Sequence, residues 1–180
     1  DIIHMTLEII LYSIIFLYGL VIGSFLNVCI YRIPKNEDLA RKRSHCMQCN
    51  YQLKWYDLVP LVSWICLGGR CRNCKEKIAI QYPMIELTNG ILYILIFCVN
   101  GFTITSVIFC FLASALLVLS VIDFRTFEIP FGINLFILAL GLIRLVLDYQ
   151  HWASYVIGLF LVSSILYLIV LLSKGKAMGG

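Results

Sequence analysis

Charged residues are scarce in this sequence. Asp, Glu, Lys and Arg make up 13% of its 180 residues, and hydrophobic residues make up 61%. A soluble globular domain has about 25% charged residues and about 45–50% apolar ones. The shortage of charge therefore argues against a soluble domain and predicts a membrane protein.

Other features are absent as well. The sequence has no internal repeat, no Ser/Pro-rich linker and no strand-length segments of alternating polarity, so spanning segments should be helices rather than barrel strands. The start lacks the basic region of a signal peptide, and His4-Met5 resembles a cloning remnant. We therefore expect residues 1–6 to be an N-terminal tail that includes this remnant.

Five apolar runs have about the 17–20 residues that a spanning helix needs. The sequence thus predicts an all-α polytopic membrane protein with about five transmembrane helices, at residues 7–30, 84–99, 104–122, 129–147 and 154–172. Gly19 and Gly23 are four residues apart in the first run, a spacing that lets another helix approach closely. The apolar run 58–67 is too short to span and contains Pro60, so it should lie on the membrane surface or pack beneath the cysteine pairs.

The polar segment 31–82 between the first two spans is basic. Ten of the fourteen Lys and Arg residues fall between positions 31 and 83, with four acids among them. The positive-inside rule places such a segment in the cytoplasm. With that placement, Arg144 is the one basic residue on the opposite side. The rule already explains the basic cluster, so we expect no nucleic-acid partner.

Two Cys-x-x-Cys pairs lie within this segment: Cys46/Cys49 and Cys71/Cys74, separated by 21 residues. The pattern is similar to a zinc ribbon, in which four thiolates surround structural Zn²⁺. The spacer is slightly longer than the usual range of about 15–20 residues. Two disulfides are an alternative, but the cytoplasm keeps thiols reduced, and a thioredoxin-like pair would need a framework that is absent. His45 is an alternative ligand, and Gly68-Gly69 should supply a permissive turn before Cys71.

Three polar residues in the spans are candidate functional residues. An ionisable group within or at the edge of a span is a functional candidate by default. Asp123 ends a long apolar run, and Glu86 is expected in the first turn of the second span, where the helix dipole also favours an acid. Asn27 should form an interhelical hydrogen bond or act near the mouth of the loop. Asp123 alone cannot carry acid–base hydrolysis, which needs a second carboxylate.

Several motifs together resemble the type IV prepilin peptidase family. They are Gly23-Ser-Phe-Leu-Asn-Val28, Tyr31-Arg-Ile-Pro34, the paired Cys-x-x-Cys motifs, Gln81-Tyr-Pro-Met-Ile-Glu-Leu87, and Ile122-Asp123 with Ile129-Pro130. The resemblance covers about residues 19–180. It implies a domain order of a first helix at 7–30, a cytoplasmic four-cysteine zinc-binding domain at 31–82, and a membrane peptidase domain at 83–180.

The resemblance also implies an activity. Members are aspartyl endopeptidases of the bacterial cytoplasmic (inner) membrane that remove leader peptides from prepilins and pseudopilins, and many N-methylate the new N-terminus with S-adenosylmethionine. Asp123 would be one catalytic aspartate, and Gly179 and Gly180 would begin the motif that carries the second. We therefore expect a chain truncated before that residue, and inactive as written.

Two further hypotheses stay open beside the peptidase. One is a non-catalytic membrane scaffold, stapled by zinc, that binds partners through the basic loop. The other is a membrane enzyme that only transfers methyl groups. In the prepilin peptidase hypothesis, the substrate's apolar helix would dock among the spans, and the small-residue face at Gly19 and Gly23 suits that role.

Overall fold

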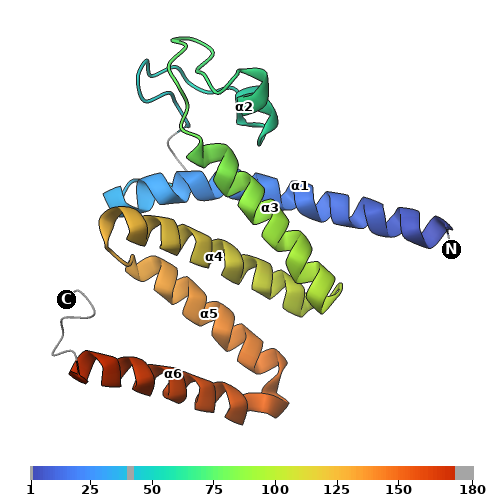
Figure 1. The fold of residues 1–180 in the computed structure, drawn as a ribbon, viewed down its shortest axis with the longest axis vertical. Coiled ribbons are helices and arrows are strands. Elements are labelled where there is room, and N and C mark those ends of the chain that lie inside the picture. The colour runs from blue at the N-terminus through green and yellow to red at the C-terminus, as the bar shows by residue number, and fades with distance from the viewer. Residues whose placement is uncertain (1, 40–42, 173–180) are drawn as a thin grey trace. The chain divides into compact units, whose positions relative to one another are not determined.

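The computed structural model describes residues 2–39 and 43–172, which are largely helical. In chain order, the elements are α1 (Ile2–Arg32), η1 (Ile33–Lys35), η2 (Trp55–Leu58), α2 (Val62–Cys66), α3 (Gln81–Asn100), α4 (Ile104–Thr126), α5 (Phe131–Leu147), η3 (Tyr149–His151) and α6 (Trp152–Leu172) (Figure 1). In these residues, strand-like pairing is limited to two isolated bridges. The predicted all-α architecture is confirmed.

By length and composition, four helices could cross a membrane: Ile2–Lys35, Gln81–Asn100, Ile104–Thr126 and Tyr149–Ile169. The fifth predicted span, α5, is an apolar helix of 17 residues. It begins after Pro130 rather than at residue 129, which leaves it at the lower limit of about 17–25 residues for a span. Helix α1 includes the predicted span 7–30 and also extends through residues 2–6.

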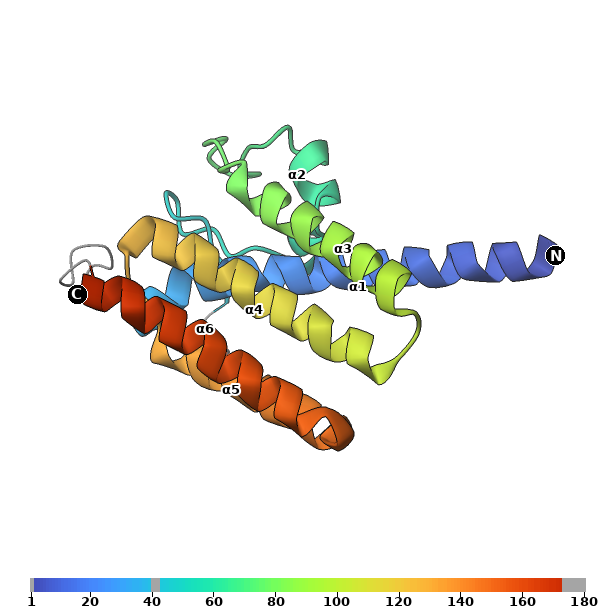
Figure 2. The same cartoon turned by 60° about the horizontal axis from the view of Figure 1, so that its bottom comes forward.

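Helices α1, α3 and α4 form the packed part of the molecule. Helix α1 packs along α3, and α4 contacts both of them (Figure 2). Their shared core includes Ile30 of α1, Ile85 of α3 and Ile122 of α4, and Ile122 is completely buried. In a lipid environment, such packing depends on close fit rather than on removing apolar surface from water.

The closest fit lies between α1 and α3. A Cβ atom added to Gly19 would lie 2.7 Å from the Cα of Gly90, and one added to Gly23 would lie 2.7 Å from the Cα of Glu86. The predicted close approach at this pair of glycines is confirmed. Their proposed role in docking a substrate helix was wrong, because α3 of the same chain already occupies that face.

Replacing Gly23 by Ala should destabilise this helix pair. The new methyl group would meet the backbone of α3, which cannot move aside as a flexible side chain could. We expect the variant to lose about 1–3 kcal/mol of unfolding free energy, the usual cost of overpacking, measured by denaturant titration in detergent. Gly132→Ala is the matched control, since a Cβ at Gly132 meets nothing within 4 Å. Equal stability of both variants would contradict the packing described here.

Residues 139–180 form a second compact unit. In its described part, the turn from α5 to α6 is organised by Asp148. This carboxylate pairs with Arg144 at 3.1 Å and with His151 at 2.7 Å, and it accepts a hydrogen bond from the Tyr155 hydroxyl at 2.7 Å. These partners lower the pKa of Asp148, with the His151 hydrogen bond as the largest cause. Arg144 therefore has a local counter-ion.

Candidate functional site: a cysteine cluster and a cavity beside α1 and α3

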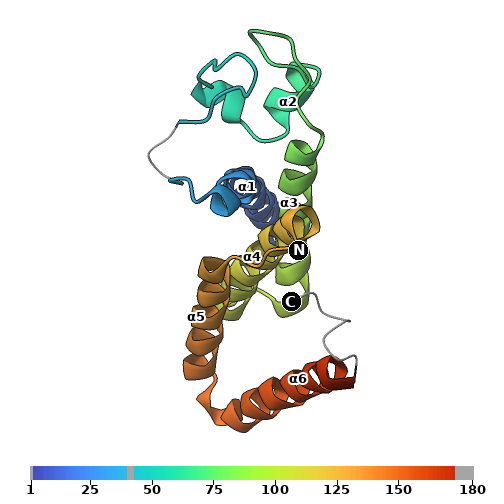
Figure 3. The ribbon, with the colours of Figure 1, turned by 90° about the vertical axis from the view of Figure 1, so that its left-hand side faces the viewer.

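Residues 43–79, here called the Cys-rich module, connect α1 to α3 (Figure 3). Its two Cys-x-x-Cys motifs fold in the same way. The N–H of Cys46 donates to the carbonyl of Tyr51 at 2.9 Å, and the N–H of Cys71 donates to the carbonyl of Glu76 at 2.8 Å. Bridges pair His45 with Gln52 and Arg70 with Lys77, at matching positions around each motif. The module therefore contains two equivalent hairpin-like knuckles.

The knuckles bring four thiols together. The Sγ atoms of Cys46, Cys49, Cys71 and Cys74 all lie within 4.8 Å of one another. Across the knuckles, Cys46 Sγ lies 3.8 Å from Cys74 Sγ, and Cys49 Sγ lies 4.0 Å from Cys71 Sγ. Sulfurs at the corners of a tetrahedron around Zn²⁺, with Zn–S near 2.3 Å, would be about 3.8 Å apart. The cluster therefore has the donor set and the spacing of a structural zinc site.

The same geometry decides between the alternative roles for these cysteines. A disulfide needs sulfurs about 2.05 Å apart, and all eight cysteines of the chain are free. His45 does not belong to the cluster; its Nδ1 lies 3.3 Å from the carbonyl oxygen of Arg43. The four thiols are thus the ligands that could hold a metal, and both alternatives from the sequence are contradicted.

The surroundings of the thiols shift their pKa values in opposite directions. The backbone N–H of Tyr51, followed by the side chain of Asn73, lowers the pKa of Cys49 to about 6. At Cys74, the Glu76 backbone also lowers the pKa, but burial and the neighbouring thiols together raise it to about 12. Four thiolates this close repel one another, so a divalent cation between them would favour their ionised form.

The turn residues of the knuckles were only partly predicted. Asn50 and Lys75 follow the second cysteine of each motif, and both have left-handed backbones, with φ of 55° and 59°. Gly68 and Gly69 also have positive φ, as expected. They end α2, where the N–H of Gly69 donates to the carbonyl of Trp64 at 2.8 Å. The predicted turn before Cys71 is therefore confirmed, whereas the left-handed residues Asn50 and Lys75 were not predicted.

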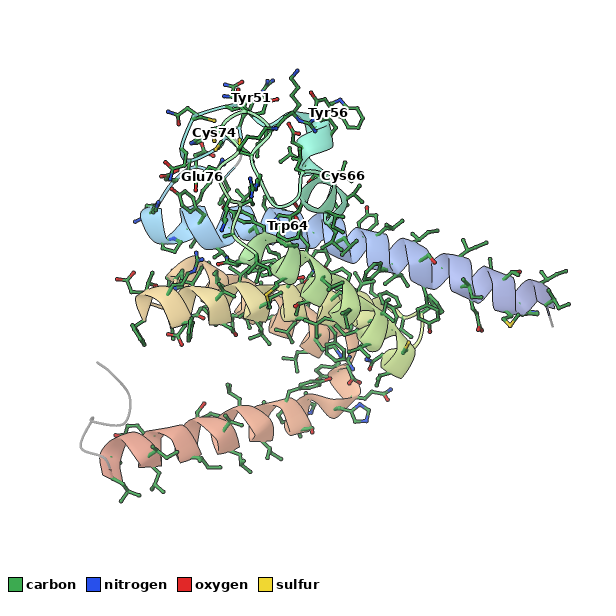
Figure 4. All side chains as sticks on the ribbon, turned by 45° about the horizontal axis from the view of Figure 1, so that its top comes forward. Tyr51, Tyr56, Trp64, Cys66, Cys74 and Glu76 are labelled. Atoms are coloured by element: carbon green, nitrogen blue, oxygen red, sulfur yellow. The ribbon has the colours of Figure 1, made fainter. Side chains whose placement is uncertain are left out.

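The apolar run 58–67 packs within the module rather than forming a span. Helix α2 places Trp64 toward α1 and α3, while Tyr51, Cys74 and Glu76 lie together in the loops (Figure 4). In the preceding turn, Asp57 forms an ion pair with Arg72 of the second knuckle at 2.8 Å. This contact joins the apolar run to the cysteine cluster.

Glu86 connects the module to α3. Its side chain is buried, with 7% of the residue exposed, and Oε2 accepts a hydrogen bond from the N–H of Leu61 at 2.8 Å. Leu61 has an unusual backbone for a residue other than glycine, with φ of 58° and ψ of −49°. Because α3 begins at Gln81, Glu86 lies in its second turn rather than in the predicted first turn. Its partner is a loop amide of the module.

Asn27 forms the predicted interhelical contact. Its Nδ2 donates to the carbonyl of Tyr82 in α3 at 3.1 Å. Its Oδ1 is buried and has no hydrogen-bond partner among the residues that the structure describes. Glu86 and Asn27 both line a cavity of about 410 Å³ that Cys46 and Cys71 also border. Asn27 and Glu86 therefore border the same cavity as two of the clustered cysteines.

Sequence reasoning missed a buried polar network between the helices. Asn89, which is fully buried, donates to the carbonyl of Gly19 at 2.8 Å and accepts from Ser114 at 2.9 Å, and Ser114 lies 3.0 Å from the hydroxyl of Tyr93. The network joins α1, α3 and α4. The sequence does contain a signal for it. Glu86, Asn89 and Tyr93 are polar residues spaced three and four positions apart, which places them on one face of a helix.

Asp123 lies apart from the cavity. It follows the buried Ile122 near the end of α4 and is itself exposed. Its carbonyl accepts from the N–H of Phe127 at 2.8 Å, which ends the helix with a left-handed residue. Arg125, two residues on, donates to Oε1 of Gln81 and so ties this end of α4 to the start of α3. Gly179 and Gly180 lie outside the described residues.

Comparisons with known proteins agree with these features. A model described as the bacterial peptidase A24 N-terminal domain matches residues 17–100, and one described as the type IV leader peptidase family matches residues 110–180. A prepilin leader peptidase/N-methyltransferase from Klebsiella pneumoniae is 33% identical over 178 residues, covering 93% of this chain and 78% of that protein. No solved structure matches the chain.

Two other relatives are longer than this chain. Proteins of the same description from Myxococcus xanthus and Vibrio cholerae are each 38% identical, over 120 and 130 residues respectively. The matches cover 67% and 68% of this chain but only 36% and 50% of those proteins. The chain therefore spans between about a third and a half of the length of these two relatives.

Proposed function

The chain belongs to the prepilin leader peptidase/N-methyltransferase family, and we propose that the full-length protein removes the leader peptide from type IV prepilins or pseudopilins. The match over 178 residues to the Klebsiella pneumoniae protein of that description carries this proposal. The substrate class follows from the relatives' descriptions. The proposed location is the bacterial inner membrane, with residues 31–82 as a cytoplasmic metal-binding domain and residues 83–180 as the peptidase domain.

Asp123 is the proposed catalytic residue of this chain. It is an exposed carboxylate at the end of a long apolar helix, where water and an extended peptide could both reach it. Hydrolysis needs one carboxylate ionised and one protonated, a state that two neighbouring acids share. We infer that the partner acid belongs to the motif that Gly179 and Gly180 begin.

The Cys-rich module has a structural role in this proposal. Four thiolates leave no open coordination position on Zn²⁺, so the metal would fix the fold of the module rather than activate water. S-adenosylmethionine would supply the methyl group if the protein also N-methylates the new N-terminus. Asn27 and Glu86 have a supporting structural role: Asn27 joins α1 to α3, and Glu86 joins α3 to the module.

The experiment that tests the function is a cleavage assay. Full-length protein in lipid vesicles should shorten a prepilin by its leader, as seen by mass spectrometry, and with S-adenosylmethionine the product should gain the mass of one methyl group if it is methylated. Intact substrate under all conditions would contradict the peptidase and favour a zinc-stapled scaffold. Methylation of a pre-cleaved substrate without cleavage would instead indicate an enzyme that only transfers methyl groups.

A further inference from the structure

The apolar run 58–67 has an inner and an outer face. It contains no Asp, Glu, Lys or Arg. Ser63 and Trp64 line the cavity beside α1 and α3, whereas Val62 and Ile65 do not line it and are 56% and 67% exposed. Val62 and Ile65 are three positions apart in α2, so they lie on the same side of this short helix. The outer face of the run is therefore aliphatic and exposed.

The run lies beside the spanning part of α1 and α3. The N–H of Leu61 donates to Glu86 at 2.8 Å, and a Cβ atom added to Gly23 would lie 2.7 Å from the Cα of Glu86. Gly23 precedes Arg32, the last residue of α1, by nine positions, which is about 14 Å along a helix. Arg32 is the first basic residue toward that end of α1. The backbone at Leu61 is thus level with the apolar part of the helix pair rather than with its charged end.

The turn before α2 is paired as an apolar environment requires. Irregular backbone persists within a bilayer only where protein groups satisfy its hydrogen bonds. The N–H of Val62 donates to the carbonyl of Pro60 at 2.5 Å, which closes a three-residue turn centred on Leu61. This turn does not use the N–H of Leu61, and the carboxylate of Glu86 accepts it. A buried acid of α3 therefore satisfies the irregular backbone of the run.

The residues just before the run are typical of a membrane–water boundary. Trp55 is exposed, and the ring of Tyr56 lies 5.8 Å from Nζ of Lys54 and 5.0 Å from the guanidinium carbon of Arg72. Trp and Tyr are enriched at the membrane interface, and Lys and Arg are attracted to anionic headgroups. A boundary at residues 54–56 leaves the uncharged positions that follow on the lipid side.

We propose that the run 58–67 inserts into the membrane leaflet next to the Cys-rich module, with Val62 and Ile65 against lipid acyl chains. The spanning helices continue this apolar surface at the same level, since Phe25 of α1 and Leu87 of α3 are also exposed. One layer of acyl chains covers all of these side chains. The inference goes beyond leader cleavage, because it concerns how the metal-binding module is held at the bilayer.

Photo-crosslinking in nanodiscs identifies the neighbour of α2. Full-length protein with p-benzoylphenylalanine in place of Ile65, and separately in place of Val62, is irradiated in phosphatidylethanolamine/phosphatidylglycerol nanodiscs, with and without a prepilin. Mass spectrometry should show the added mass of one phospholipid, attached through its acyl chain. Gln52 of the first knuckle is exposed and serves as the control position. It should give about 10-fold less lipid adduct, because an aliphatic position gains at least that factor from an apolar environment.

The other outcomes would overturn the proposal. Adducts to the prepilin or to a second copy of the chain, in place of lipid, would show that a protein covers this face. Adducts to the lipid headgroup alone would place the run on the membrane surface without insertion. Equal lipid yields at positions 65 and 52 would show no specific contact. Unchanged zinc content in each labelled protein confirms that the module is folded.

Two changes at Glu86 test how the run is held. Glu86→Leu removes the acceptor of the Leu61 N–H, and the yield of lipid adduct from position 65 should fall about 10-fold, as expected for a lost hydrogen bond to a charged group. Glu86→Gln keeps an oxygen that can accept this hydrogen bond, so most of the yield should remain. A full yield in the Glu86→Leu protein would overturn the role of Glu86. Cleavage is read separately: lipid adducts without cleavage refute only the peptidase, and cleavage without lipid adducts refutes only the insertion.

Discussion

Replacing Asp123 by Asn in the full-length protein should abolish leader cleavage. Asn keeps the size and polarity of the side chain but cannot carry a proton between water and the scissile amide. A positioned acid or base contributes about 10²–10⁴-fold to a rate, so the initial rate of product formation should fall by at least that range. Because Asp123 is exposed and makes no side-chain contact on which the described core depends, folding and metal content should not change.

Glu128→Gln is the matched control for this experiment. It also changes an exposed acid to an amide near the end of α4, five residues away, and its rate should stay close to that of the unchanged protein. Cleavage by the Asp123→Asn protein at more than about a tenth of the normal rate is incompatible with a role as general acid or base. It would show that other residues of the full-length protein carry out the cleavage.

The second large effect is expected at the metal cluster. Cys46→Ser should reduce bound zinc from one per chain to nearly none, because three thiolates and a hydroxyl form a much weaker site. Structural zinc contributes roughly 10–16 kcal/mol to folding in small zinc domains, which is more than a short module with few buried apolar side chains can replace. The module should then unfold locally. Elemental analysis and trypsin digestion at its basic residues would measure both changes.

Cys66→Ser separates this effect from a general effect of losing a thiol. Cys66 ends α2 in the same module, but it is exposed and does not belong to the cluster. This variant should keep its zinc and resist trypsin as well as the unchanged protein does. Stoichiometric metal in the Cys46→Ser protein would show that the cluster is not the site.

Features that depend on local spacing were predictable from the sequence. The two-residue gap within each cysteine pair fixes a knuckle, so the clustering of Cys46, Cys49, Cys71 and Cys74 followed without knowledge of the fold. The approximate positions of the long helices followed from the apolar runs in the same way, although α1, α3 and α4 are longer than the runs that predicted them. The four-residue spacing of Gly19 and Gly23 predicted a close helix contact, although it could not identify α3 as the partner.

Features that depend on contacts distant in the sequence were not predictable. The hydrogen bond from Leu61 to Glu86 joins residues 25 positions apart, and it requires a backbone conformation that leucine rarely adopts. The Asn89–Ser114 contact likewise needs α3 and α4 in register. Periodicity identifies which face of a helix is polar, but only the packed structure shows what that face meets.

The knuckle geometry also has a consequence for the chain entropy of the Cys-rich module. Cys49 and Cys71 close a loop of 22 positions, longer than the usual spacer in such sites. Closure entropy grows only with the logarithm of loop length, at about 0.6 kcal/mol per doubling. A few extra residues therefore cost the metal site almost nothing. The spacer is free to vary, and here it carries α2 and the Leu61 amide that attaches the module to α3.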